Sequence, residues 1–311
     1  MKRAAQLPPG IAGRAFTSAE AAAAGLRPGR LRRSDLDSPF RGIYAAPRTL
    51  VSAESLVLAY ALRMSPDHFY SHVTAALIYG LPLPAHLQRS MTLHVSTETP
   101  AVRHGSTGVI GHHVKRGTVR VVDAYGLRVS SPVDTWCQLA TVLSLDDLIR
   151  VGDALVRRKN PFATLAGLRA GAVRYAGKRG AKALRQALLW IRPGVDSPTE
   201  TDVRLLLVRA GLPEPEVNGE ITDGWGVCIA HGDLVYRDFR VLVEYDDGQH
   251  RTNESQYNSD VNGLDAIIEE RWRVLRINKS YSSPVIVRRV ETALRAAGWR
   301  PDQCAPPRES G

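Results

Sequence analysis

The most constraining feature of this sequence is an apolar strand that leads straight into acidic residues. Val241-Leu242-Val243 is aliphatic and mostly β-branched, which predicts a buried strand. Glu244 and Asp246 follow at a spacing of two, so both lie on one face of that strand. Asp233, in Gly232-Asp233-Leu234, belongs to the preceding predicted strand and can lie alongside Glu244. The sequence therefore brings carboxylates together where a core is expected.

Converging carboxylates of this kind suit a hard divalent cation. A buried carboxylate without a partner costs several kcal/mol, by rough estimate, unless a cation or donor compensates it. Mg²⁺ takes one or two carboxylates together with water and phosphate oxygens. We expect Asp233 and Glu244 to bind Mg²⁺, with Mn²⁺ as the alternative ion. A second interpretation stays open, because acids before Asp247-Gly248 also begin ordinary turns.

The charge of the chain is unevenly distributed. Its 311 residues are enough for two or three domains, and the net charge is +10. Residues 1–193 hold 27 Lys and Arg against 11 Asp and Glu, whereas residues 194–300 hold 13 against 18. The basic part is the better candidate for contact with a polyanion such as DNA. An arginine-rich composition inherited from a GC-rich genome is the alternative explanation.

The sequence carries no sign of a membrane protein or an exported one. It has no apolar window of membrane-spanning length, and no apolar stretch follows Met1-Lys2-Arg3. The three cysteines, Cys137, Cys228 and Cys304, are scattered and lack metal-ligand or disulfide-framework spacing. We expect a cytoplasmic protein without a membrane partner.

Residues 1–48 have the pattern of a small DNA-binding domain. Thr17 and Glu20 form a capping box at a helix start, and a second short helix is predicted over residues 28–36. Residues 40–45 follow as a strand-like wing, so the order predicts a winged helix-turn-helix. A solvated arginine face on a small packing domain explains the pattern equally well. The arginines expected to contact DNA are Arg27, Arg30, Arg32 and Arg33.

This region also resembles a known family. The segments that carry the resemblance are Phe16-Thr17, Ala22, Gly25-Leu26, Leu31-Arg32-Arg33 and Arg41-Gly42-Ile43-Tyr44. Together they resemble the N-terminal winged-helix domain of AbiEi-type antitoxins and related regulators. The resemblance implies DNA binding at a promoter and a toxin as a candidate partner. A second copy of the chain is the other candidate.

Residues 49–193 predict an α+β middle region, similar to the one that accompanies this winged helix in AbiEi-like proteins. Residues 169–192 form a basic, helix-rich connector, for which a linker is favoured over a second phosphate contact. His104, His112 and His113 lie near one another in the sequence, but neighbours on one strand point to opposite faces. For them we favour a surface strand over a metal site. The predicted helices are 53–64, 71–79, 132–143 and 145–158, and the predicted strands are 91–96, 109–113, 119–122 and 127–129.

Residues 194–300 have a clear predicted order, followed by a tail at 301–311. Ser197-Pro198-Thr199-Glu200 opens a helix that runs to Ala210. Strands follow near 216–221, 225–235 and 240–246, then a helix near 256–270, a strand at 273–277 and a helix at 284–297. This αβββαβα order is the core of the PD-(D/E)xK nuclease fold. The expected fold class is thus a multi-domain α+β and α/β protein that combines a winged helix, an α+β middle region and this core.

Individual residues strengthen that resemblance. Ser-Pro-Thr-Glu at 197–200, Gly-Asp-Leu at 232–234, Glu-Tyr-Asp-Asp-Gly-Gln-His at 244–250 and Trp-Arg-Val-Leu-Arg at 272–276 resemble endonuclease domains related to very-short-patch repair nucleases. The resemblance implies that Asp233 and Glu244 are the metal carboxylates and that Glu200 adds an acid from the first helix. The other implied site residues are Asp246 as a further ligand, His250 beside the scissile phosphate and Arg276 on the DNA backbone.

One departure bears on activity. The family motif has lysine two positions after the second acid, where this chain has Asp246. His250 can take over a proton-transfer role, since an unperturbed imidazole titrates near pH 6.5, about the working range of a general base. Glu200 as a simple helix cap and His250 as a turn residue remain the alternatives. We therefore expect a Mg²⁺-dependent DNA endonuclease, or alternatively an AbiEi-like antitoxin regulator with an inactive nuclease-fold domain.

Overall fold

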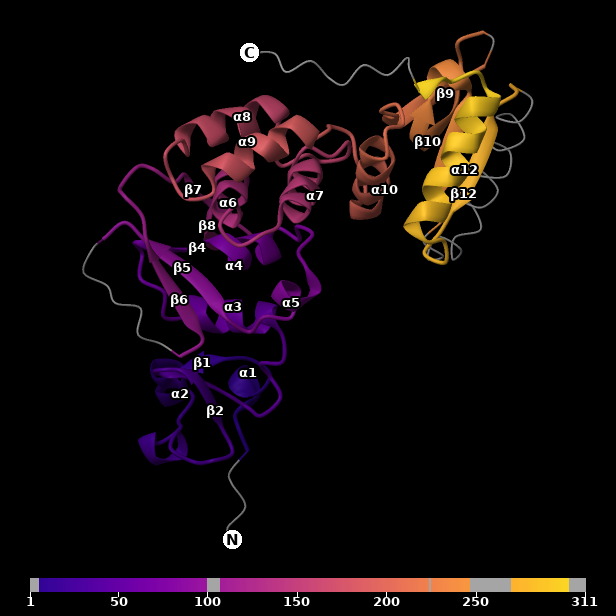
Figure 1. Ribbon diagram of the computed structural model, residues 1–311. Coiled ribbons are helices and arrows are strands. Elements are labelled where there is room, and N and C mark those ends of the chain that lie inside the picture. Colours follow the sequence, from indigo (N-terminus) through magenta and orange to yellow (C-terminus); the bar gives the residue numbers. More distant parts are fainter. Residues whose placement is uncertain (1–5, 100–106, 224, 247–269, 302–311) are drawn as a thin grey trace. The chain divides into compact units, whose positions relative to one another are not determined.

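The computed structural model of this chain describes residues 6–99, 107–223, 225–246 and 270–301 (Figure 1). Within these ranges it is a mixed α/β protein, as predicted, with strands in three separate sheets. The chain divides into two compact units. Unit 1 comprises residues 1–151 and 166–186, and unit 2 comprises residues 152–165 and 187–311. No helix among the described residues is long and apolar enough to cross a membrane.

The first sheet has three short antiparallel strands in the order β1-β3-β2. The predicted capping box is confirmed: the Thr17 hydroxyl accepts from the Glu20 amide, and the Glu20 carboxylate accepts from the Thr17 amide at 2.7 Å. Gly25 follows with a φ of 80°, a conformation that suits glycine and ends the helix. The elements are Pro9–Ala12 (α1), Phe16–Thr17 (β1), Ser18–Ala23 (α2), Asp37–Phe40 (β2) and Ile43–Ala45 (β3).

The second helix predicted over residues 28–36 is wrong. Only one 3-10 turn forms, at Pro28–Arg30 (η1), and the chain then continues as successive turns. Gly29, Ser34 and Asp35 are poor helix formers. In addition, the Arg30 guanidinium donates twice to the Asp35 carboxylate, at 2.9 and 2.8 Å, and holds the turn closed. Residues 40–45, predicted as a strand-like wing, contain the end of β2 and all of β3, which pair as a hairpin, and the winged-helix assignment stays a prediction.

The rest of unit 1 is built on a five-stranded mixed sheet in the order β6-β5-β4-β8-β7. Helices α3 and α4 pack against this sheet, and α6 packs on α4 (Figure 1). The strands are His68–Tyr70 (β4), Leu93–Thr97 (β5), Val109–His113 (β6), Val121–Ala124 (β7) and Leu127–Ser130 (β8). The helices of residues 49–193 are Ala53–Ala61 (α3), His72–Ile78 (α4), Ala85–Gln88 (α5), Pro132–Leu139 (α6), Leu145–Leu155 (α7), Leu165–Arg174 (α8) and Ala181–Trp190 (α9).

Most predicted elements of this region form within a few residues of their expected bounds. The sequence analysis missed β4, the central strand of the sheet, whose three residues are all buried. The basic connector at 169–192 is helical, because α8 and α9 fill most of it, and most of its basic side chains are exposed. The exposed cations include Arg174, Lys178, Arg179, Lys182 and Arg185.

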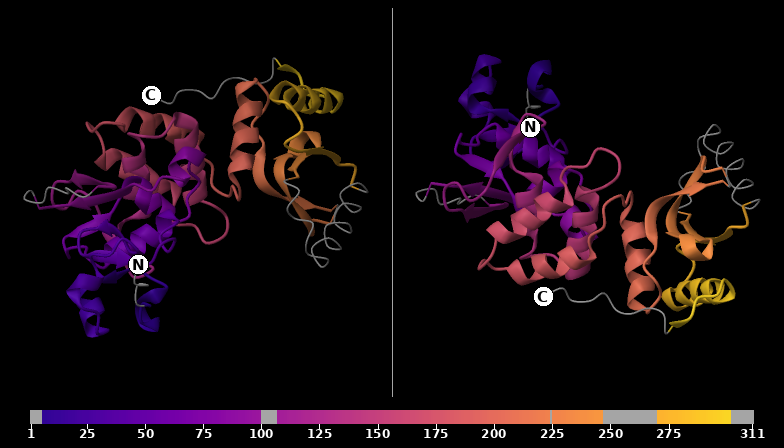
Figure 2. Two further views of the ribbon diagram at one scale, coloured as in Figure 1. Left: turned by 90° about the horizontal axis from the view of Figure 1, so that it is seen from below. Right: turned by 90° about the horizontal axis from the view of Figure 1, so that it is seen from above.

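Unit 2 contains a four-stranded sheet in the order β12-β11-β10-β9. Strand β12 runs parallel to β11, and the other neighbours are antiparallel. Helices α10 and α12 lie together on one face of the sheet (Figure 2), where Leu207 and Val290 join a buried cluster with Val243. The elements are Pro198–Arg209 (α10), Glu216–Thr222 (β9), Cys228–Tyr236 (β10), Arg237–Phe239 (η2), Val241–Tyr245 (β11), Arg273–Ile277 (β12) and Ser283–Ala296 (α12).

These elements follow the predicted order as far as they are described. The predicted helix near 256–270 lies, apart from Glu270, outside the described residues. Strand β10 begins at Cys228 rather than at Trp225, because the Asp223 carboxylate accepts from the Trp225 and Val227 amides and closes a turn. Only the mixed α/β character of unit 2 is established here, and the nuclease-fold assignment stays a prediction.

Candidate active site

Strand register places Asp233 and Glu244 side by side in unit 2. Leu234 pairs with Val243 in the antiparallel β10–β11 ladder, so Asp233 and Glu244 occupy its next position. The Asp233 carboxylate accepts a hydrogen bond from the Tyr245 amide at 2.8 Å. The Glu244 carboxyl in turn accepts from the Asp233 amide. Backbone amides thus fix both acids at the end of the same ladder.

The two acids lie on the sheet face turned away from α10 and α12. Val235 and Leu242, each two residues away along its strand and so on the same face as Asp233 and Glu244, belong to a separate small buried cluster. Leu234 and Val243, one residue along, belong to the helix-covered cluster. The alternation that the sequence predicts along β11 is therefore confirmed up to Glu244, which is half-buried.

Glu200 lies in the first turn of α10 and is only 7% exposed. Ser197 caps the helix by accepting from the Glu200 amide at 3.2 Å. The Glu200 carboxylate accepts from the Asp196 amide at 3.1 Å and from the Asn218 side chain at 2.8 Å. It therefore does more than cap its helix, because it also ties α10 to β9. Sequence analysis missed Asn218, whose φ of 47° is one that asparagine tolerates well.

The electrostatics connect the three acids. Burial, together with the neighbouring Asp233 carboxylate, raises the pKa of Glu244 to about 8, and Glu200 contributes in the same direction. Burial also raises the pKa of Glu200, again with a contribution from Asp233. Arg276 opposes the effect on Glu244, because its positive charge favours the ionised carboxylate. Ionising all three acids would place like charges in a partly desolvated region, and a bound cation would stabilise that charged state.

Asp246 and Arg276 are less enclosed than the three acids. Asp246 is exposed, and its amide donates to the Ile277 carbonyl at 2.8 Å. Arg276 is exposed on β12, directly opposite Glu244 in the parallel ladder. His250 lies outside the described residues.

A buried ion pair anchors the helix that carries Glu200. Arg204 of α10 and Asp153 are both fully buried and meet at 2.9 Å. The Thr201 hydroxyl and the Arg192 amide also donate to Asp153, both at 2.8 Å. Asp153 thus holds α10 one residue after Glu200, and the sequence analysis did not single it out.

The three acids do not have the close spacing of a complete metal-ligand set. Two groups of described residues place three ligand atoms within 4.8 Å of one another, and Glu200, Asp233 and Glu244 form neither of them. The chemistry of the donors still fits a hard cation, because they are carboxylate oxygens whose mutual repulsion a divalent ion would relieve. An open arrangement also leaves coordination positions for water and phosphate oxygens.

The arginines predicted to contact DNA fall into two classes. Arg27, Arg32 and Arg33 are exposed in unit 1. Arg30 is bound to Asp35, and its side chain is 10% exposed, so it is not available to DNA in this conformation. A DNA contact by Arg30 stays a prediction, and it would require the Arg30–Asp35 pair to open.

The histidines are arranged differently from the expectation. His104 lies outside the described residues, and His113 is exposed. His112 instead meets His72 and His94, and these three form one of the two groups with metal-ligand spacing. The sequence analysis missed His72 and His94 because they are far from His112 in the chain.

Comparison of the chain with protein-family models, with curated proteins and with solved structures gave no match. The resemblances to AbiEi-type and very-short-patch-repair-like proteins therefore remain proposals, and function has to be argued from the site.

Proposed function

We propose that this protein binds DNA and hydrolyses its phosphodiester bonds with a divalent cation, Mg²⁺ or Mn²⁺, held by Asp233 and Glu244. The observation that carries the proposal is the pair itself: two acids at adjacent positions of β10 and β11, with the pKa of Glu244 raised to about 8 by burial and by Asp233. Such a pair is electrostatically unfavourable alone and becomes favourable when a cation lies between its members.

In this proposal each residue of the site has its own role. The cation, when bound, activates a water molecule and neutralises a phosphate oxygen. Asp233 and Glu244 supply the ligand oxygens, and the Tyr245 amide keeps Asp233 oriented. Glu200 adds negative charge from α10 and is held in place by Asn218. In this proposal Arg276, which is exposed and opposite Glu244 in the β11–β12 ladder, binds the DNA backbone.

The basic N-terminal part supports a DNA substrate. Arg27, Arg32 and Arg33 are exposed cations in unit 1 and are suited to phosphate contacts. Asp246, which stands where the related nucleases carry lysine, supports the second candidate function. In that version the protein is an AbiEi-like transcriptional regulator, and unit 2 is a catalytically silent module.

A plasmid cleavage assay tests the proposal. Supercoiled DNA is incubated with the protein and Mg²⁺ or Mn²⁺, and the expected result is nicking or linearisation that a chelator stops. Asp233→Asn and Glu244→Gln keep the side-chain shapes and should abolish cleavage while DNA binding, measured by gel shift, persists. Asp238→Asn, which changes an exposed acid in η2, is the matched control and should cleave like the wild type.

The same experiment separates the two candidates. DNA binding without cleavage under either ion favours the regulator, particularly if Arg32→Ala with Arg33→Ala abolishes a shift of the protein's own upstream region. Cleavage that survives Asp233→Asn and Glu244→Gln would overturn the assignment of the site.

A further inference from the structure

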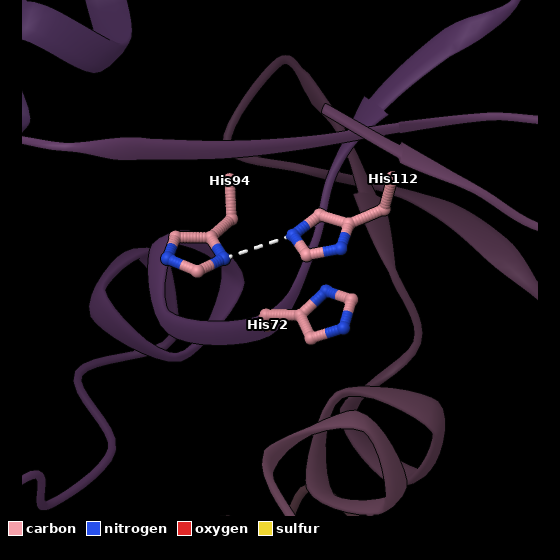
Figure 3. Close-up of side chains that lie close together, drawn as sticks. All are labelled: His72, His94 and His112. Carbon is pink, nitrogen blue, oxygen red and sulfur yellow. Dashed lines mark hydrogen bonds between the residues drawn. The ribbon is translucent and has the colours of Figure 1, made fainter. Parts of the chain in front are cut away.

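Three histidines from distant parts of unit 1 converge on one point (Figure 3). His72 is the first residue of α4, His94 lies on β5 and His112 lies on β6. In the parallel β5–β6 ladder His94 pairs with Ile110 and Ser96 with His112, so the two imidazoles lie diagonally on one face of the sheet. All three side chains are partly buried, and their ligand atoms lie within 4.8 Å of one another.

The contacts between the rings are close. Nδ1 of His94 and Nε2 of His112 are 3.0 Å apart, and the rings of His72 and His112 stack with centroids 3.8 Å apart. Two nitrogens bound to one tetrahedral zinc ion lie about 3.3 Å apart, given Zn–N bonds of about 2.0–2.1 Å. A small opening of the His94–His112 pair and a rotation of the His72 ring would thus admit an ion.

The surroundings of His72 resemble the support that metal-binding histidines receive. Its Nδ1 is 3.0 Å from the Ser71 hydroxyl, which also accepts from Ser96 at 2.7 Å. Metal-bound histidines usually donate their second ring nitrogen to such a partner. The His72 amide donates to Gln138 Oε1 at 3.0 Å, while the buried Nε2 of Gln138 has no hydrogen-bond partner among the described residues.

The backbone of His72 is also unusual. Its φ is 50°, in the left-handed region that non-glycine residues rarely adopt. Such strain persists only where neighbouring structure imposes it, and it is concentrated at functional sites. Here the strained residue is His72, which begins α4 and stacks its imidazole on that of His112 from β6.

Two of the three imidazoles are poorly suited to carry a proton. Burial and the neighbouring rings lower the pKa of His72 to about 3, and burial with His112 lowers that of His94 to about 4. Both rings are therefore neutral near pH 7, with lone pairs available to a cation. Neutral imidazole nitrogens bind late first-row divalent ions well and Mg²⁺ poorly.

We propose that His72, His94 and His112 form a binding site for one late first-row divalent ion, Zn²⁺ first among them. Three protein ligands leave a fourth position open for water or a small anion, as in zinc sites that bind exchangeable ligands. This site uses nitrogen donors in unit 1 and is separate from the carboxylates of unit 2, so it does not depend on the nuclease proposal.

Zinc titration of the untagged, chelator-treated protein against a chromogenic chelator tests the site. The wild type should bind one Zn²⁺ at this site, and Co²⁺ should give the strong visible absorption of a tetrahedral complex. His112→Ala should weaken binding by about tenfold or more, since even the loss of a supporting partner costs a site about 10–100-fold. Ser71→Ala, which removes such a partner, should weaken binding within that range.

Two controls make the result specific. His113→Ala alters the exposed neighbour on the same strand and should bind zinc like the wild type. Cys228→Ala disrupts the other group with ligand spacing, the exposed Glu220, Cys228 and His231, and should leave the Co²⁺ spectrum unchanged. Zn²⁺ should raise the melting temperature of the wild type but not of His112→Ala, and the two should melt alike in chelator.

His112→Asn, which retains a polar side chain, replaces His112→Ala if the latter does not fold. Wild-type affinity in the His112 variant, equal losses in His112→Ala and His113→Ala, or no stoichiometric zinc in the wild type would overturn the proposal.

Discussion

Glu244 experiences two opposing influences at the end of β11. Burial and the adjacent Asp233 favour its neutral form, whereas Arg276 favours the charged one, and the outcome is a pKa of about 8 instead of 4.5. Near pH 7 Glu244 therefore retains its proton, which a cation bound at the proposed site would displace. Burial and the proximity of Asp233 disfavour the charged form of Glu244, and a cation bound at the proposed site would favour it.

This shift predicts how stability depends on pH. The folded state binds the Glu244 proton more tightly than the unfolded state, so its stabilising effect is complete below pH 4.5 and is lost as the pH rises to about 8. Urea unfolding of the metal-free protein should show a free energy of unfolding that falls across this window more steeply than that of Glu244→Gln. Saturating Mg²⁺ should flatten the wild-type curve. Parallel curves for the two proteins would show that Glu244 titrates normally.

At the scale of elements, α10 depends on a charge pair with no access to water. Arg204 and Asp153 are both fully buried at 2.9 Å, and Arg204 also donates to the Trp190 carbonyl at 2.7 Å. Removing the Arg204 guanidinium would leave the buried Asp153 carboxylate without its counter-charge.

We therefore expect Arg204→Ala to lower the free energy of unfolding by about 3–5 kcal/mol, measured by chemical denaturation. Arg209→Ala, at the C-terminal end of the same helix, should cost far less because Arg209 is exposed. The double variant Asp153→Leu with Arg204→Met should be more stable than Arg204→Ala alone, since it buries no unpaired charge. If Arg204→Ala is no more costly than Arg209→Ala, the pair does not anchor the helix.

Elements with strong local signals were predictable from the sequence. Strand β12 matches its expected bounds, and Thr17 and Ser197 cap the helices that were predicted for them. The helix expected at 28–36 does not form beyond the 3-10 turn at Pro28–Arg30, because Gly29 and Asp35 disfavour a helix there. Strand β4 was missed because three residues are too few to show a period, although tertiary pairing makes it central.

The candidate sites were predictable to different degrees for a related reason. Asp233 and Glu244 come from consecutive strands, so their proximity follows from a simple hairpin-like pairing. His72, His94 and His112 meet only through the mixed order of the five-stranded sheet, which no local pattern reveals. Their partner Gln138 comes from α6, still further along the chain.

At the scale of the whole molecule, charge is separated along the chain. The excess of Lys and Arg lies in residues 1–193, and the excess of Asp and Glu lies in residues 194–300. Exposed arginines in unit 1 are expected to supply DNA affinity, whereas the acids of unit 2 require a cation before they can approach a phosphate.

Salt dependence of DNA binding tests this division of labour. Arg32→Ala with Arg33→Ala should weaken binding and reduce the slope of log affinity against log salt by roughly 2, since each phosphate contact contributes about 0.9. Lys182→Ala with Arg185→Ala removes equal charge from exposed positions of α9 and should change the slope little. Equal effects of the two double variants would indicate diffuse attraction instead of a defined contact.

The most direct test of a shared cation is calorimetric titration with Mg²⁺ in two buffers of different protonation enthalpy. Comparison of the heats gives the number of protons released for each ion bound. We predict one Mg²⁺, close to one proton released near pH 7, almost none released about one pH unit above the Glu244 pKa of about 8, and no binding by Asp233→Asn. Binding without proton release near pH 7, or binding that survives Asp233→Asn, would contradict the claim that Asp233 and Glu244 hold the ion together.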